Sequence, residues 1–228
     1  MPPEVSELPV SRLVEAERSG NGFAGCRRAG AELALFHAYW AYLSGSRLAR
    51  IGQFEAAARR ISAAAEDVPE AAGLATASEF YKGVSLLQQD KSIEAAQALR
   101  DVVKRDASNQ AAVQLLDIAE SSAAFDRQDW DAFLEKALTI AGRQPGSFDA
   151  SASLASAYAC KYAVSGSPEF RERSLLELEK AKQSGADRAQ IADIVDRVEH
   201  RLAARQILSP SQFAKQFPNG WHKGATVQ

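Results

Sequence analysis

A pattern of small and apolar residues occurs three times along the chain at a fixed interval of 38 residues. In the first copy, Ala57 is followed by Ile61, Ala64 and Pro69. The corresponding residues are Ala95, Leu99, Val102 and Ala107 in the second copy, and Phe133, Ala137, Ile140 and Pro145 in the third. Self-similarity at a period between about 20 and 50 residues is typical of proteins built from stacked repeats. The pattern therefore predicts a repeat architecture.

Around these positions apolar residues recur every three or four places, which indicates amphipathic helices. The expected helices pair into hairpins: 29–51 with a helix ending near 66, 70–89 with 92–105, and 109–127 with 130–141. A fourth pair, 147–164 with 169–183, has a longer turn, because Ser174 comes three residues later than the interval requires. A single hairpin cannot cover its own apolar face, so we expect neighbouring hairpins to stack.

These elements divide the chain into four regions. Residues 1–28 form a lead-in with a short helix at 9–19, and residues 29–183 hold the repeats, at about 30–69, 70–107, 108–145 and 147–183. A helix over 186–208 has one apolar stripe, formed by Ile191, Ile194, Val195, Val198 and Leu202. Such an amphipathic helix can close the last apolar face of a stack. His200 lies among its charged residues, and we expect it to be solvated.

The fourth region is the tail, residues 209–228, in which Ser209 or Ser211 can cap one turn of helix. Its large apolar residues are Phe213, Phe217 and Trp221. Burying each would gain about 1.5 to 3 kcal/mol, so we expect them to dock on a protein surface. The sequence leaves the place open: the protein's own groove, a second copy or a different protein, with a disordered tail as the remaining alternative.

The repeats resemble tetratricopeptide repeat proteins. The family's spacing is kept throughout by Gly45, Leu48, Ala57, Ile61 and Pro69, and it holds less completely in the next two copies. The resemblance implies an all-α, right-handed superhelix of helical hairpins, with the capping helix and aromatic tail after it. The chain departs from the family in its period, which is 38 residues rather than about 34. It also departs where the family has Trp and Leu, with Asp117 and Glu120 in the third copy.

In that family the first helix of each hairpin lines a concave surface that binds peptides. The residues at the corresponding positions are aromatic or aliphatic: Tyr39, Tyr42, Phe80, Val84, Leu87, Leu115, Ile118 and Phe125. They predict a groove for an apolar peptide or helix rather than a clamp for a carboxylate. The alternative is that most of them are core residues between helices.

Composition narrows the classes of partner. The 228 residues are 46% hydrophobic and carry a net charge of −2, which gives no global field to hold nucleic acid. No run approaches the roughly 20 apolar residues that cross a bilayer. The two cysteines, Cys26 and Cys160, are too few for a disulfide framework or a zinc site, and they favour reduced thiols in a cytoplasmic protein.

The sequence carries no recognisable catalytic, cofactor or metal motif. His37 lies within an apolar helix and is expected to pack or to line the groove, and neither cysteine has a histidine at a motif spacing. The sequence therefore predicts a non-enzymatic scaffold or adaptor for another protein. Two alternatives remain: a structural subunit that self-associates, and a chaperone of the kind used in secretion.

Overall fold

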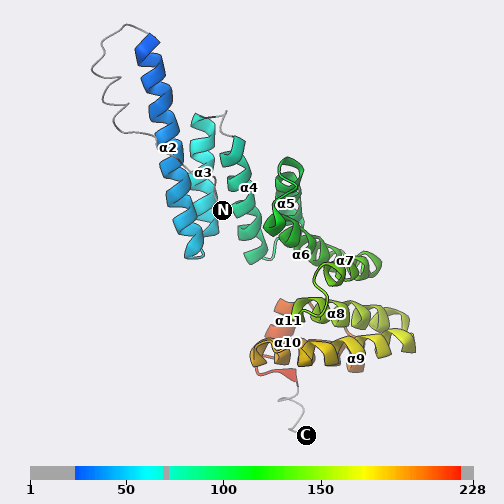
Figure 1. Cartoon of the computed structure of the whole chain (residues 1–228). Coiled ribbons are helices and arrows are strands. Elements are labelled where there is room, and N and C mark those ends of the chain that lie inside the picture. Colours follow the sequence, from blue (N-terminus) through cyan, green and yellow to red (C-terminus); the bar gives the residue numbers. More distant parts are fainter. Residues whose placement is uncertain (1–23, 69–71, 222–228) are drawn as a thin grey trace. The chain divides into compact units, whose positions relative to one another are not determined.

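The computed structural model describes residues 24–68 and 72–221, and every element in these residues is an α-helix (Figure 1). This confirms the all-α fold class. Consecutive helices pack against their neighbours, as in a solenoid of helical repeats. The helices fall into two compact units, one with residues up to 89 together with 98–108, the other with 90–97 and 109 onwards. Each unit is described by itself.

The first unit contains α2 (Ala24–Arg50), α3 (Phe54–Asp67), α4 (Ala72–Gln88) and most of α5 (Ser92–Arg105). The core between α2, α3 and α4 is built from small and medium side chains, namely Ala38, Ala41, Ile61, Ala64, Val68 and Leu74. Ile61 and Ala64 belong to the repeated pattern, and they face inward on α3. The pattern read from the sequence is therefore the buried side of the second helix of the hairpin.

Each hairpin of this unit is held together by a glycine that faces a large side chain. A Cβ placed on Gly45 in α2 would lie only 2.6 Å from Ile61 Cγ1, and a Cβ on Gly83 in α4 would lie 2.7 Å from Leu99 Cγ in α5. In the third repeat the corresponding residues are Ser121 and Ala137, both buried. The first position has therefore gained volume where the second has lost it. Close packing requires such complementary changes.

The second unit contains the remaining helices: α6 (Gln110–Asp126), α7 (Trp130–Arg143), α8 (Phe148–Ser165), α9 (Pro168–Gln183), α10 (Arg188–Ala204) and α11 (Pro210–Gln216). The starts of α6, α7, α8 and α11 are fixed by side chains that accept a hydrogen bond from a backbone N–H of the first turn. Asn109, Asp129, Ser147 and Ser209 serve in this way, and Gln212 completes a capping box with Ser209.

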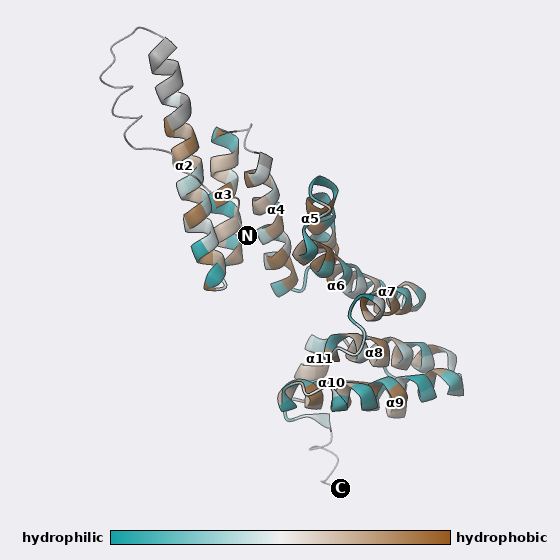
Figure 2. Cartoon of the chain, in the orientation of Figure 1, coloured by the Kyte–Doolittle hydropathy of each residue, from teal (hydrophilic) through white to brown (hydrophobic). Residues whose placement is uncertain are grey.

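Helix α8 is the centre of the second unit. It is buried along most of residues 150–160, and it packs against α7, α9 and α10. On α9 and α10 hydrophobic turns alternate with strongly hydrophilic ones (Figure 2). Leu178 of α9 and Ile194, Val198 and Leu202 of α10 close a core against Ala155 and Ala159 of α8. Helix α10 thus covers the apolar sides of α8 and α9.

Helix α10 ends at Ala204 and not at 207–208, where the sequence analysis places its end. Arg205 adopts a left-handed conformation with φ of 53° and turns the chain. Its Nε donates to the carbonyl oxygen of Ala163 at 3.3 Å, and its guanidinium lies 5.7 Å from the ring centroid of Tyr162. Contacts with α8, far away in the sequence, therefore end the helix one turn early.

The polar residues that depart from the family pattern form ion pairs across the third hairpin. Asp117 is buried on α6 and accepts a hydrogen bond from Nη1 of Arg143 on α7. Glu120, one turn later, lies 2.6 Å from Nζ of Lys136. A buried carboxylate requires a partner of opposite charge, so these pairs make polar residues compatible with a helix–helix contact.

Candidate functional site

Five of the predicted groove residues lie in the first unit, and all five are half-buried. Tyr42 packs against the core between α2 and α3, while Tyr39 lies on the same helix. Phe80, Val84 and Leu87 are on α4, and the ring of Phe80 meets that of Tyr81 edge-on at 5.5 Å. These residues are partly available to a partner and partly used in packing.

The other three groove residues belong to the second unit. Ile118 is exposed on α6 and Leu115 is half-buried. Phe125 serves the core: it meets Trp130 and Phe133 edge-on at 5.5 Å, and the Arg201 guanidinium lies 5.3 Å from its ring centroid. Phe125 therefore packs as a core residue, which is the alternative that the sequence left open. A groove formed by all eight residues remains a prediction.

Helix α2 presents a second apolar surface that the sequence analysis did not single out. Leu33, Phe36, Trp40 and Leu43 are 41% to 59% exposed. Their spacing of three, four and three residues places them in one row on one side of the helix. We call these four residues the α2 row. Exposed apolar side chains that are contiguous, rather than scattered singly, mark interaction sites.

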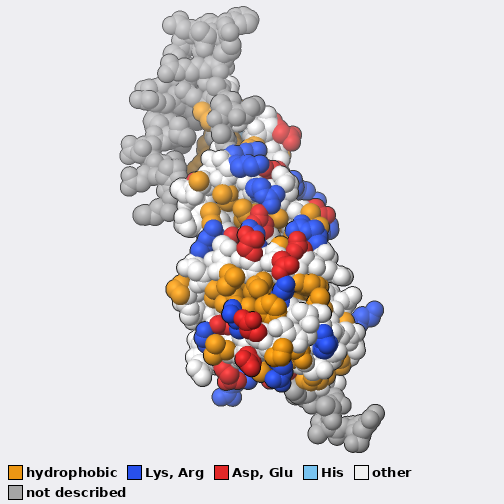
Figure 3. Space-filling model, turned by 90° about the vertical axis from the view of Figure 1, so that its right-hand side faces the viewer, with side chains coloured by type: hydrophobic (Ala, Val, Ile, Leu, Met, Phe, Trp, Pro, Cys, Tyr) orange, Lys and Arg blue, Asp and Glu red, His pale blue; other side chains and the backbone are white. Residues whose placement is uncertain are grey.

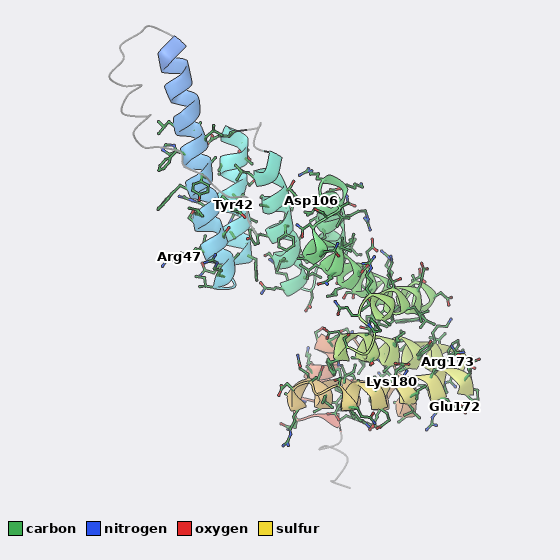
Figure 4. All side chains as sticks on the ribbon, in the orientation of Figure 1. Tyr42, Arg47, Asp106, Glu172, Arg173 and Lys180 are labelled. Atoms are coloured by element: carbon green, nitrogen blue, oxygen red, sulfur yellow. The ribbon has the colours of Figure 1, made fainter. Side chains whose placement is uncertain are left out.

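The opposite side of α2 is the one that packs in the core, and its residues are small. Ala38, Ala41 and Gly45 are buried there against α3. Tyr42 lies on the side of α2 that faces α3, whereas Arg47 points away from it (Figure 4). The helix thus buries small residues against α3, while the large residues of the α2 row are exposed. Each large apolar side chain left in water forgoes about 1.5 to 3 kcal/mol of burial.

The recurrence of apolar residues every three or four places was visible in the sequence, but it could not identify the exposed side of α2. The apolar residues of α2 occupy several faces of the helix, so the pattern indicates a broad face without saying which part is covered. The partners that select the buried part are Ile61 and Ala64, which come from the next helix. His37 is also exposed, with its ring 6.3 Å from that of Phe36.

The aromatic tail docks on helix α10 of its own chain. The imidazole of His200 is surrounded by Phe213, Phe217 and Trp221, with ring centroids 5.5, 5.1 and 5.6 Å away. The backbone N–H of Trp221 donates to Oδ2 of Asp196 at 3.1 Å. The described part of the tail, residues 209–221, therefore lies against α10, which is not one of the predicted groove helices. This place on α10 is none of those that the sequence leaves open, which are the protein's own groove, a second copy and a different protein.

The expectation that His200 is solvated is wrong, because the tail covers it. Its side chain is buried, and Nδ1 has no hydrogen-bond partner in the part of the chain that the structure describes. Burial lowers the pKa of His200, and the positive charge of Arg201 lowers it further. The neutral imidazole is the form that fits between three aromatic rings and an arginine.

Arg201 and Cys160 lie in the interior of the second unit. The Arg201 guanidinium donates to Ser156 Oγ and, at 3.2 Å, to the carbonyl oxygen of Leu208, so it ties α10 to α8 and to the start of the tail. Burial lowers the pKa of Arg201. Burial also raises the pKa of the Cys160 thiol, more than the nearby Arg201 charge lowers it. A thiol in this state is a poor nucleophile.

Lysine, arginine, aspartate and glutamate side chains mix with apolar ones on the face drawn in Figure 3, so charge of neither sign dominates that face. Among residues 24–68 and 72–221, no group of three or more histidine, cysteine, aspartate or glutamate side chains is placed to hold a metal ion. Within the same residues, no helix combines the length and the apolar character needed to cross a bilayer.

No family model, curated protein or solved structure matches the chain. The features that bear on function are therefore those of this chain itself. Among these features is the α2 row, whose large apolar side chains are exposed rather than packed in the core.

Proposed function

We propose that this protein is a non-catalytic scaffold or adaptor that binds an apolar helix or peptide of another protein. The observation that carries the proposal is the α2 row, where large apolar side chains face outward while small ones fill the core. A rigid array of packed helices limits the entropy lost when such a surface binds a partner. The resemblance to tetratricopeptide repeat proteins, which bind peptides, supports the same function.

The half-buried groove residues on α4 are a second candidate for contact with the same partner. The proposal also includes a cytoplasmic location, which rests on the use of only two cysteines. Self-association through the tail is less favoured, because Phe213 is buried against α10 and its neighbours Phe217 and Trp221 pack there too. The surface on which that alternative depended is occupied within the chain.

The test compares proteins that co-purify with the wild type and with two surface variants. One variant carries Trp40→Glu and Leu43→Glu on α2, and the other carries Phe80→Asp and Leu87→Asp on α4. Leu176→Glu on α9 is the matched control, because Leu176 is as exposed as Trp40 but lies outside both surfaces. We expect the same partner to be recovered with the wild type and the control and to be lost with at least one variant.

Circular dichroism of each variant would establish that it is folded. If all four proteins recover the same set of partners, the scaffold proposal is wrong. Loss with the α4 variant alone would keep the function and assign binding to the predicted groove.

A further inference from the structure

The four side chains of the α2 row lie in two parallel columns along the helix axis. Leu33 and Trp40 are seven residues apart, as are Phe36 and Leu43. Continuing each column by seven residues leads to Arg47 and Arg50, which are exposed in the last turn of α2. This is the spacing of the seam of a coiled coil, with an apolar part followed by a basic part. No described helix packs on this side of α2: its contacts are with α3 and α4.

The shape of the row suits a helix. With a rise of about 1.5 Å per residue, the apolar part from residue 33 to residue 43 is about 15 Å long. Two columns of side chains form holes that receive the side chains of a facing helix. An extended peptide would fit less well, because the backbone N–H and C=O groups of α2 are already hydrogen-bonded within the helix and cannot pair with a strand. Trp40, near the middle, is the type of residue that dominates binding energy at interfaces.

Charge decides what kind of helix fits. The sequence of α2 contains four arginines and one glutamate, although the whole chain is slightly acidic. Two copies of α2 therefore repel each other, which disfavours a second copy of this chain as the occupant. A partner with acidic residues where its own seam reaches Arg47 and Arg50 is attracted, and guanidinium groups bind carboxylates in a defined geometry.

Resting on the proposed function, we infer that the partner supplies an amphipathic helix with an apolar seam of about two heptads that continues into acidic residues. The apolar seam packs on Leu33, Phe36, Trp40 and Leu43. The acidic residues pair with Arg47 and Arg50. The partner's helix thereby covers the side of α2 on which no described helix packs.

The probes for a test are two synthetic helices. Both have leucine at the seam positions of two central heptads. The acidic peptide has glutamate at the seam positions beyond each end, so it can bind in either direction, and the basic peptide has lysine there. Fluorescence anisotropy with the full-length chain measures both affinities. We expect the acidic peptide to bind at least about tenfold more tightly than the basic one.

Variants of the chain identify the surface. Trp40→Ala should weaken binding of the acidic peptide at least about tenfold, whereas Leu176→Ala on α9 should leave it unchanged. Replacing both Arg47 and Arg50 by glutamate should reverse the preference, so that the basic peptide now binds better. Circular dichroism of this variant would establish that it is folded. Equal affinity of both peptides, or binding that ignores Trp40→Ala, would overturn the inference.

Other occupants give different results, which also overturn it. A wild-type dimer in sedimentation that Trp40→Ala converts to a monomer assigns the α2 row to a second copy. Leu13 and Val14 are apolar residues of the helix expected over 9–19. If the full-length chain binds the acidic peptide only after Leu13→Asp and Val14→Asp, residues 1–23 are the occupant of the α2 row. If partner recovery depends on Trp40 and Leu43 while the peptides are not discriminated, the scaffold function stands and only the acidic helix is wrong.

Discussion

The first and the last long helices of the described chain treat their apolar residues in opposite ways. Helix α2 packs through Ala38 and Ala41 and leaves Trp40 in water. Helix α10 packs through Ile194 and Val198, and the tail folds over His200 on its remaining surface. Helix α2 packs on α3 and α4, and helix α10 packs on α8 and α9. The tail packs on α10, whereas no described helix packs on the α2 row.

Core truncation should show the largest difference between the two ends. Leu178 is almost fully buried between α8, α9 and α10, and Leu178→Ala should lower the free energy of unfolding by about 2 to 5 kcal/mol. Trp40→Ala removes a larger side chain, but we expect a change within about 0.5 kcal/mol because the ring is exposed. Urea denaturation of each variant measures both. Comparable losses would show that Trp40 is covered in solution.

The packing side of α2 can be tested by enlarging a glycine. Gly45→Val places atoms against Ile61 and the carbonyl oxygen of Ala57, and it should destabilise the first unit by about 1 to 3 kcal/mol. Gly30, on the same helix, has no atom within 4 Å of the added Cβ, so Gly30→Val is the matched control. Combining Gly45→Val with Ile61→Ala should cost less than the sum of the two changes, because the smaller residue makes room. Strict additivity in thermal denaturation would contradict the close contact.

Acidification should loosen the covered end, with a smaller effect. The pKa of His200 is lowered in the docked state. Below about pH 6.5, His200 therefore binds a proton more readily when the tail is released than when it is docked. Tail docking is therefore fully stable above that pH and weakens as the pH falls toward the pKa of the docked state. Hydrogen exchange at the Trp221 amide, which donates to Asp196, reports the release.

The control for acidification is His200→Asn, which cannot take up a proton in this range. The wild type should lose Trp221 protection between pH 7.5 and 5.5 by a larger factor than the variant, after correction for intrinsic exchange. Equal losses in both proteins would show that His200 does not control docking of the tail.

Much of the fold could be predicted because it is encoded locally. The bounds of α5 are those that the sequence indicates, and Asn109 and Ser147 stand at or just before the expected helix starts. The contacts that the sequence could not reveal are between distant residues. His200 is buried by residues 13 to 21 positions later, and Arg205 ends α10 by binding α8. The local spacing of apolar residues cannot indicate either contact.

The candidate site illustrates the same limit. Periodicity identified apolar first helices, and the family resemblance placed Tyr39 and Tyr42 in the predicted groove; Tyr42 packs against the core. Periodicity did not single out Leu33 and Trp40, because an apolar residue gives the same signal whether it faces a core or a partner. The α2 row became visible only once α3 and α4 had occupied the other side of the helix.

The paired volumes at Gly45 and Ile61, Gly83 and Leu99, and Ser121 and Ala137 constrain how such a chain can be rebuilt. A helix exchanged between the third repeat and either of the first two would bring a clash or leave a void, because the residues at these positions differ in size. The unit that can be duplicated, deleted or grafted is therefore the whole hairpin, since it carries both halves of the match.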